Sequence, residues 1–213
     1  MNIKTFSLLI LSFFFIQNLT SQTQLGSTIS GENDGDYFGR DVSLSSDGTI
    51  MAVGAIENDG GGENVGHVRV FKFSDGSWTQ IGADIDTSGS SSSQGNLNGD
   101  FGHSVSLSSD GTILAVGDRY FSSDNGINSG LVRVFQYLND SWSQIGSDII
   151  GLSANSNFGF DVSISSDGTI VSSGDIGHNE LSGTVRVFKF VNDSWNQLGD
   201  NIQGVNYGER LGY

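Results

Sequence analysis

The chain of 213 residues contains no cysteine and no proline, and only 9 of its residues are Lys or Arg. Without cysteine it cannot form disulfides, so hydrogen bonding and packing must supply its stability. The 24 Asp and Glu residues give a formal net charge of −15, which repels phosphate backbones and anionic lipids. We therefore expect no nucleic-acid partner and favour cations or basic proteins as ligands.

Long hydrophobic runs are also scarce, since the chain has one, at residues 6–16 (FSLLILSFFFI), just after Lys4. This run is too short to span a bilayer comfortably, and polar and small residues follow it. The pattern is typical of a secretory signal peptide, residues 1–21, cleaved near Ser21. The alternative is a buried N-terminal strand or anchor. We expect a secreted or cell-surface protein with no membrane span after cleavage.

What the chain does have is one sequence block written three times. FGRDVSLSSDGTIMAVGA begins at Phe38, FGHSVSLSSDGTILAVGD at Phe101 and FGFDVSISSDGTIVSSGD at Phe158, and each is followed by a block with VRVF and Trp. The Phe always lies nine positions before the Asp of SSDGT, and the first Val of VRVF ten positions before the Trp. Such a repeat is one structural unit copied along the chain.

Each unit is predicted to form four antiparallel strands, a to d. The pair Asp47-Gly48 and its copies lie between apolar strands, which predicts a two-residue type I′ turn between strands a and b. Strand c carries apolar side chains on both faces, at Val68 and Val70 and at Phe71 and Phe73, so neighbours must cover both faces. The sequence therefore predicts an all-β protein, a β-propeller of four-stranded antiparallel blades.

About three blades are present, which makes an incomplete ring. We predict a lone strand d and loop at 22–37, blade 1 at 38–100, blade 2 at 101–157, blade 3 at 158–210 and the start of a truncated fourth repeat at 211–213. The spacing changes only in the b–c and d–a connections, which emerge at one end of an up-and-down blade. Loops that vary on a constant frame commonly carry binding, so this end is the predicted binding face.

Two short motifs resemble the FG-GAP repeats of integrin-α-type propellers. They are FG at the start of each unit and Gly-Ala or Gly-Asp at the end of the first hairpin, as at Gly54-Ala55. The whole unit is similar to FG-GAP-like repeats of secreted bacterial surface proteins, from about Gln22 to the end. The resemblance implies a propeller used for adhesion, binding or scaffolding. WD40 propellers are a poorer match, because their period is about 40 to 45 residues, whereas the units here begin further apart, at Phe38, Phe101 and Phe158.

The resemblance also implies calcium loops, but the sequence departs from them. SSDGT supplies one carboxylate, at Asp47, Asp110 or Asp167, where calcium requires six or more oxygens. ENDGD at 32–36 and ENDGGGEN at 57–64 remain as candidate calcium loops, although neither has the usual alternating acidic spacing. The alternative is solvated turns, so we assign no metal and no cofactor-binding residue.

Acidic residues collect in the variable connections, against Arg119 alone as a cation. They predict a cation-binding or basic-partner surface. The acidic residues are Glu32, Asp34, Asp36, Glu57, Asp59, Glu63, Asp86, Asp100, Asp118, Asp124, Asp175 and Glu180.

Other recurrent residues have a structural interpretation. Arg69, Arg133 and Arg186 recur in strand c, where we expect them to pack over the next blade and pair with an Asp rather than form a ligand-binding ring. Trp78, Trp142 and Trp195 recur with the frame and are expected in the core. For carbohydrate stacking, only Tyr120 and Phe121 lie in variable loops.

The sequence gives little support for catalysis. His67, His103 and His178 occupy three different repeat positions, and no nucleophile motif is present. We assign no catalytic residue and expect a binding or adhesion module for a protein or carbohydrate ligand. The alternative is a structural propeller piece that assembles with further blades or a second copy through its open edges. A hydrolase or lyase on a propeller is a weaker third hypothesis.

Overall fold

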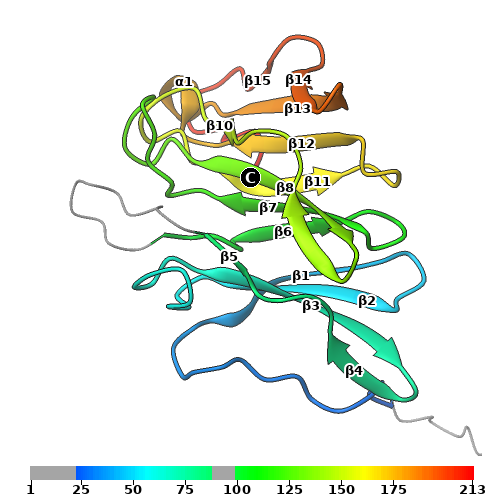
Figure 1. The fold of residues 1–213 in the computed structure, drawn as a ribbon. Coiled ribbons are helices and arrows are strands. Elements are labelled where there is room, and N and C mark those ends of the chain that lie inside the picture. The colour runs from blue at the N-terminus through cyan, green and yellow to red at the C-terminus, as the bar shows by residue number, and fades with distance from the viewer. Residues whose placement is uncertain (1–22, 88–98) are drawn as a thin grey trace, which may run out of the picture.

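Three antiparallel sheets follow one another along the chain in the computed structural model, which describes residues 23–87 and 99–213 apart from the side chains of Asn179 and Glu180. Figure 1 shows the sheets stacked one upon the next. The predicted signal peptide, residues 1–21, lies outside the described residues.

Each sheet has the same set of strands. The first contains β1 (Phe38–Leu44), β2 (Ile50–Ala55), β3 (His67–Ser74), β4 (Ser77–Gln80) and β5 (Ile85–Asp86). The second contains β6 (Ser104–Leu107), β7 (Ile113–Asp118), β8 (Leu131–Leu138), β9 (Ser141–Gln144) and β10 (Ile149–Ile150). The third contains β11 (Phe158–Ile164), β12 (Ile170–Asp175), β13 (Thr184–Val191), β14 (Ser194–Gln197) and β15 (Ile202–Gln203). A single helical turn, α1 (His178–Leu181), precedes β13.

The outermost strand of each sheet is broken into two pieces. In the first sheet the order is β1-β2-β3-β4, and β5 pairs with the other half of β3. Here β4 and β5 together are the predicted strand d, interrupted at Gly82, whose φ is +71°. The protein is thus an all-β chain of three four-stranded antiparallel blades, a partial β-propeller, as the sequence predicted.

The prediction for the a–b turn was wrong in its type. Of the Asp47-Gly48 pair only Gly48 has a positive φ, and its N–H donates to the Ser45 carbonyl at 2.9 Å, which excludes a two-residue I′ turn. Asp47 instead accepts from the Ser45 hydroxyl (2.7 Å) and the Thr49 N–H (2.9 Å), so side chains hold a wider loop. The positive-φ pairs of type I′ lie in the c–d turns, at Asp75-Gly76 and its copies.

Glycine contacts explain the repeated FG and Gly-Ala or Gly-Asp motifs. A Cβ added to Gly54 would lie 2.0 Å from the Gly102 carbonyl oxygen of the next blade, so neither backbone leaves room for a side chain. Gly117 and Gly159 repeat this contact at the second seam. The two motifs are therefore the two halves of one close backbone approach between neighbouring blades.

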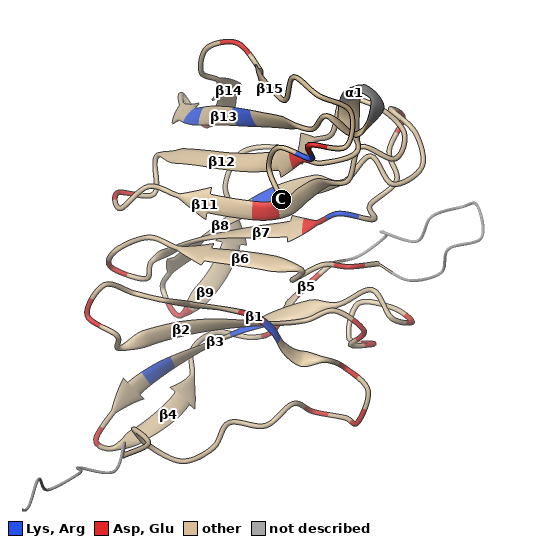
Figure 2. Ribbon diagram, turned by 180° about the vertical axis from the view of Figure 1, so that it is seen from behind, with Lys and Arg blue, Asp and Glu red and all other residues tan. Residues whose placement is uncertain are grey.

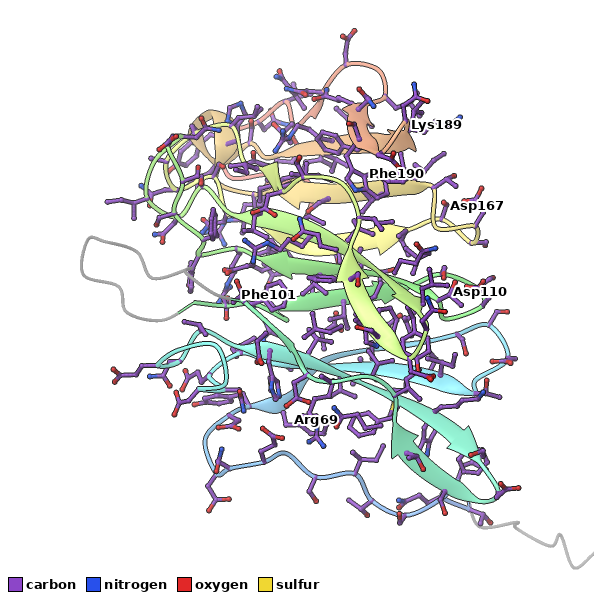
Figure 3. The ribbon with its side chains drawn as sticks, in the orientation of Figure 1. Arg69, Phe101, Asp110, Asp167, Lys189 and Phe190 are labelled. Carbon is purple, nitrogen blue, oxygen red and sulfur yellow. The ribbon has the colours of Figure 1, made fainter. Side chains whose placement is uncertain are left out.

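Hydrophobic side chains fill the two seams between blades. One cluster joins Val68 and Val70 of the first blade to Phe101 and Leu114 of the second, and the other joins Val132 and Val134 to Phe158. In Figure 3 the labelled Phe101 lies between the first two sheets, while Asp110 and Asp167 lie at the turn end. As predicted, each sheet is covered on both faces where it has a neighbour.

The innermost strands are joined by side chains. The Val105 N–H donates to Asp41 Oδ2 (2.7 Å), and the Val162 N–H donates to Ser104 Oγ (2.9 Å), at the same repeat position. Contacts between sheets concentrate at these strands, so the blades converge at β1, β6 and β11. Hydrogen bonding at this position thus sets the register of one blade on the next.

The segment before β1 differs from the prediction. Its described part, residues 23–37, forms no strand. It nevertheless lies where the outer strand of a preceding blade would lie. The Leu25 carbonyl accepts from Trp78 Nε1 at 3.0 Å, as the Ile81 carbonyl accepts from Trp142 Nε1 at 3.2 Å.

At the other end, Leu211 forms an isolated bridge with Gly183, as Phe158 does with Gly130. Residues 211–213 therefore occupy the position of the next FG. Within the described residues, no helix is long and apolar enough to cross a membrane.

Candidate functional site

The variable connections emerge together, opposite the constant turns (Figure 1). Figure 2 shows acidic residues at both ends, so acid is not confined to the variable face. At the turn end, hydrogen bonds from Ser165 and Thr169 hold the pKa of Asp167 at about 2. These carboxylates are engaged by their own turns, so the SSDGT loops do not fit a calcium ion.

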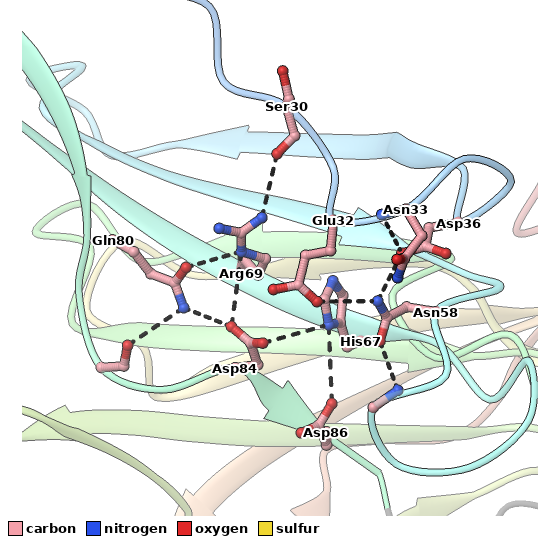
Figure 4. Close-up of polar contacts among 12 residues, drawn as sticks. Ser30, Glu32, Asn33, Asp36, Asn58, His67, Arg69, Gln80, Asp84 and Asp86 are labelled. Carbon is pink, nitrogen blue, oxygen red and sulfur yellow. Dashed lines mark hydrogen bonds and ion pairs between the residues drawn. The ribbon is translucent and has the colours of Figure 1, made fainter.

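The predicted acidic residues do not form one surface. Asp36, Asp100, Asp118 and Asp175 are buried. Burial, with a contribution from Asp100, raises the pKa of Asp118 to about 7. The Glu180 side chain lies outside the described atoms. Of the predicted set, Glu32, Asp36 and Asp86 come together, in the first blade (Figure 4).

Asn58 joins the two connections that carry these acids. Its Nδ2 donates to Asp36 Oδ2 (2.8 Å) and Glu32 Oε2 (3.3 Å), while its Oδ1 accepts from the Gly60 N–H (2.8 Å). Asn58 is buried, so the link is shielded from water. The candidate calcium loops at 32–36 and 57–64 thus hydrogen-bond to each other and to their own backbone and do not wrap an ion.

His67 lies at the centre of this end of the blade. Antiparallel pairing of β3 with β5 places His67 opposite Asp86, and the break at Gly82 brings Asp84 beside it. His67 Nδ1 is 3.9 Å from Asp84 Oδ2 and 3.9 Å from Asp86 Oδ1. We call Glu32, His67, Asp84 and Asp86 the His67 cluster.

Burial disfavours the charged form of the imidazole. Burial lowers the pKa of His67, although Asp84, Glu32 and Asp86 act to raise it. Burial also raises the pKa of Asp86. With its side chain 1% exposed, His67 Nδ1 has no hydrogen-bond partner among the described residues. The cluster therefore holds a buried, uncharged nitrogen among carboxylates.

The recurrent arginines and tryptophans connect neighbouring blades. Arg133 Nη1 donates to Thr87 Oγ1 (2.6 Å) and Arg186 Nη2 to the Ile150 carbonyl (2.8 Å), so they reach the preceding blade and not the next one as predicted. The predicted pairing with an Asp occurs at Arg133 and Asp148 (2.9 Å). Trp195 Nε1 donates to the Ile145 carbonyl (3.0 Å). These residues are part of the frame.

A cavity lies along the innermost strands. The residue after FG in each unit, namely Arg40, His103, Phe160 and Tyr213, lines a cavity of about 410 Å³. Arg40 Nη2 lies 3.0 Å from His103 Nε2, and His103 Nδ1 lies 3.0 Å from Asp100 Oδ2. Because arginine only donates, His103 Nε2 accepts this hydrogen bond, whereas Nδ1 makes no hydrogen bond with the described residues despite its approach to Asp100.

The loop aromatics give limited support to a carbohydrate site. Tyr120 lines a neighbouring cavity of about 330 Å³, but the Arg119 guanidinium lies 4.4 Å from its ring centroid. Phe121 has Arg133 at 5.8 Å. Each ring thus already has a guanidinium nearby.

Comparison with known proteins identifies the repeat. The family model of the FG-GAP repeat matches residues 28–71, which cover the first hairpin and strand c of the first blade. The first blade therefore carries a match to the FG-GAP repeat. The two later copies of the same motifs extend the FG-GAP-like pattern to Tyr213. No curated protein matches the chain.

Among solved structures, the chain is similar to a putative 6-phosphogluconolactonase from Bacteroides uniformis ATCC 8492. The two share 16% identity over 77% of this chain and 56% of that one, with a TM-score of 0.40. The FG-GAP-like chain spans just over half the length of that protein. A TM-score at this level supports no argument about function.

Sequence reasoning missed three residues of the first blade: Asn58, His67 as a site residue, and Asp84. The available signal was a departure from the repeat, since His67 stands where the other units have Leu131 and Thr184. Asp86 likewise replaces Ile150 and Gln203.

Proposed function

We propose that the chain is a secreted or cell-surface FG-GAP-type propeller segment that binds a basic protein partner through the loop end of its first blade. The observation that supports it is the group of exposed carboxylates there, which we call the acidic loop end: Glu32, Asp34, Asp59, Glu63 and Asp86. Like-charged groups held on two linked connections attract cationic partners and accelerate their encounter.

The frame supports this role because the exposed acids are not needed for folding in the way the buried ones are. Asp36 accepts hydrogen bonds from Asn33 and Asn58, whereas Glu63 and Asp34 lie on the outside of their turns. Binding could therefore use the outer acids without loss of the fold. The proposed role is binding and not catalysis.

A charge-matched pair of triple variants tests the proposal. The first variant combines Asp34→Asn, Asp59→Asn and Glu63→Gln at the acidic loop end. The control combines Asp75→Asn, Asp140→Asn and Asp193→Asn in the c–d turns, where Asn accepts the positive φ of the native residues. Both variants remove three negative charges, so they differ only in the end that is changed.

Binding of a lysine-rich peptide is measured for each by fluorescence anisotropy at low and moderate salt. We expect about a tenfold loss of affinity for the loop variant and little change for the control. Equal weakening in both variants would mean that net charge, and not the acidic loop end, attracts the peptide.

A second candidate function, assembly with further blades, is favoured by the outer face of the third blade. Ile85 and Ile149 are buried in the seams, but Ile202 at the same repeat position is 57% exposed. Asp161 occupies the position from which Asp41 and Ser104 accept an N–H of the next blade. The third blade therefore has the groups that formed the other two seams.

The mass of the chain in solution tests assembly. If a second copy covers this face, the mass should exceed that of a monomer, and Ile202→Lys should return it to the monomer. Leu138→Lys changes another exposed residue, at the turn end of the second blade, and should leave the mass unaltered. A monomer at all concentrations would argue that the face is covered only by further blades of a longer chain.

A further inference from the structure

The His67 cluster contains a buried polar atom with nothing to bond to. His67 Nδ1 has no hydrogen-bond partner in the described structure, and a carboxylate oxygen from each of Asp84 and Asp86 faces it at 3.9 Å. These distances are too long for hydrogen bonds. Leaving a buried nitrogen unpaired costs about 1–3 kcal/mol when no ligand binds it.

The ligand-type atoms of the cluster converge. One atom each from Glu32, His67 and Asp84 lie within 4.8 Å of one another. They come from three separate segments of the chain: the turn before β1, the start of β3 and the break before β5 (Figure 4). Three donors from three chain segments around one point form the arrangement that a bound ion would hold together.

The second blade shows what the same frame does without a histidine. There Leu131 replaces His67, and Asp148, the counterpart of Asp84, is held by Arg133 through two hydrogen bonds of 2.9 Å. In the first blade, Arg69 Nε donates to Gln80 Oε1 (2.9 Å) and stays 3.8 Å from Asp84 Oδ1. Asp84 Oδ1 thus has a long ion pair with Arg69 and a hydrogen bond from Gln80 Nε2 (2.6 Å), while Oδ2 faces His67.

We propose that the His67 cluster is a binding site for a divalent transition-metal ion, with zinc as the best match, held by His67 Nδ1 and by carboxylate oxygens of Glu32 and Asp84. Asp86 or a water molecule takes the fourth position.

The donor set selects this class of ion. An uncharged imidazole with carboxylates suits zinc and its neighbours, whereas calcium takes six to eight oxygens and no nitrogen. In a tetrahedral site with bonds of about 2.0–2.1 Å, donor atoms lie about 3.4 Å apart. The 3.9 Å separations therefore need to shorten by only about half an ångström on binding.

The surroundings allow this movement. Glu32 is exposed, and its carboxylate accepts one long hydrogen bond, from Asn58 Nδ2 at 3.3 Å, so a second oxygen is left for an ion. On the opposite side, a Cβ at Gly60 would lie 2.6 Å from Asp86 Oδ1, so the glycine leaves the space that the carboxylate occupies. A bound ion would tie the three connections into one unit. The inference does not rest on the proposed function, since a metal could be bound here without any basic partner.

The test uses the chelator-treated chain titrated with zinc chloride by calorimetry, and with cobalt chloride by visible absorption. We expect one zinc ion per chain, cobalt bands of tetrahedral intensity, and much weaker binding of calcium. His67→Gln should lower zinc affinity at least ~100-fold, since loss of a direct ligand exceeds the 10–100-fold effect of outer partners. Glu32→Gln, at an exposed position, should also weaken binding and serves if His67→Gln does not fold.

Two controls limit the interpretation. His178→Gln removes a histidine outside the cluster, and Asp148→Asn changes the counterpart of Asp84 in the second blade; both should keep zinc affinity within about threefold. The triple variant Asp34→Asn, Asp59→Asn and Glu63→Gln should keep zinc affinity while losing the lysine-rich peptide, which separates this inference from the proposed function. No zinc binding at millimolar concentration, or equal affinity in His67→Gln and the parent chain, would overturn the proposal.

Discussion

The first and second blades share one frame but use it differently at their loop ends. Both have an arginine in strand c, a glutamine in the first half of strand d and an aspartate before its second half. In the second blade Arg133 and Asp148 close on each other. Although burial acts to raise it, the hydrogen bonds and charge of Arg133 hold the pKa of Asp148 below its usual value.

Two substitutions account for the difference. The first blade has His67 and Asp86 where the second has Leu131 and Ile150. The exchange replaces two apolar side chains by an imidazole and a third carboxylate, and Asp84 then faces the histidine. A repeated frame thus allows one copy to hold unsatisfied polar groups that the other copy excludes, which is typical of functional positions.

The largest difference between the blades should appear at the Phe that opens each unit. Phe101 is fully buried in the first seam, with its ring 6.2 Å from Phe135. Phe38 makes the same edge contact with Phe71, but it is partly exposed and lines a hollow together with residues of the segment before β1. Phe101→Ala should cost about 3–5 kcal/mol of unfolding free energy and Phe38→Ala clearly less. Denaturant titration of both variants measures this, and equal losses would mean that blade 1 is as well covered as blade 2.

The next effect is a pH dependence from a position that is titratable in blade 2 and not in blade 1. Asp118 is buried with a pKa raised to about 7, whereas blade 1 has Ala55 at this position. Between its unfolded value near 4 and about 7, the folded chain binds a proton that the unfolded chain does not, so stability falls as pH rises. Asp118→Asn should remove that fall.

The measurement compares unfolding free energies of the parent chain and Asp118→Asn at pH 4 and pH 8. The variant should be about as stable at pH 4 and more stable, by up to about 4 kcal/mol, at pH 8. Asn keeps an oxygen that can accept from the Asp100 and Tyr120 N–H groups, as Asp118 does. Asp175→Asn, at the same position of the third blade, provides a second test of the same pH dependence. Burial also raises the pKa of Asp175, although the charge of Arg186 acts to lower it. A parallel pH profile for Asp118→Asn would contradict the assignment.

A smaller effect is expected from giving blade 1 the residue of blade 2. His67→Leu removes the unpaired Nδ1, so in the presence of a chelator the variant should be more stable by about 1 kcal/mol. Thermal unfolding of the parent chain and of His67→Leu, each with chelator and with zinc chloride, measures this difference. Only the parent chain should gain stability from zinc. Loss of stability in the chelated variant would mean that His67 has a structural partner.

These comparisons also show how far the sequence could predict the molecule. Blades and seams followed from spacing, because a repeated block fixes the register of every copy at once. The a–b turn was misjudged because Ser45 and Thr49 donate to Asp47 and stabilise a wider loop, which an Asp-Gly pair alone does not reveal.

The His67 cluster could not be predicted, because its members lie 52 positions apart from Glu32 to Asp84. They meet only through the break at Gly82, the pairing of His67 with Asp86 and the link made by Asn58. The one accessible signal was the exception to the repeat at position 67. In repeat proteins, a titratable residue at a repeat position where the other copies have none is thus a better indicator of a site than a local motif.

The smallest predicted effect concerns the arginine that both blades share. Arg133 makes a two-point contact with Asp148 that a lysine cannot reproduce, whereas Arg69 contacts Gln80, Ser30 and, at 3.8 Å, Asp84. A double-mutant cycle of Arg133→Lys with Asp148→Asn should give a coupling energy of about 1 kcal/mol, and the cycle of Arg69→Lys with Asp84→Asn less than about half of that. Equal coupling in the two cycles would mean that Asp84 belongs to Arg69 in solution, which would leave His67 without its nearest carboxylate.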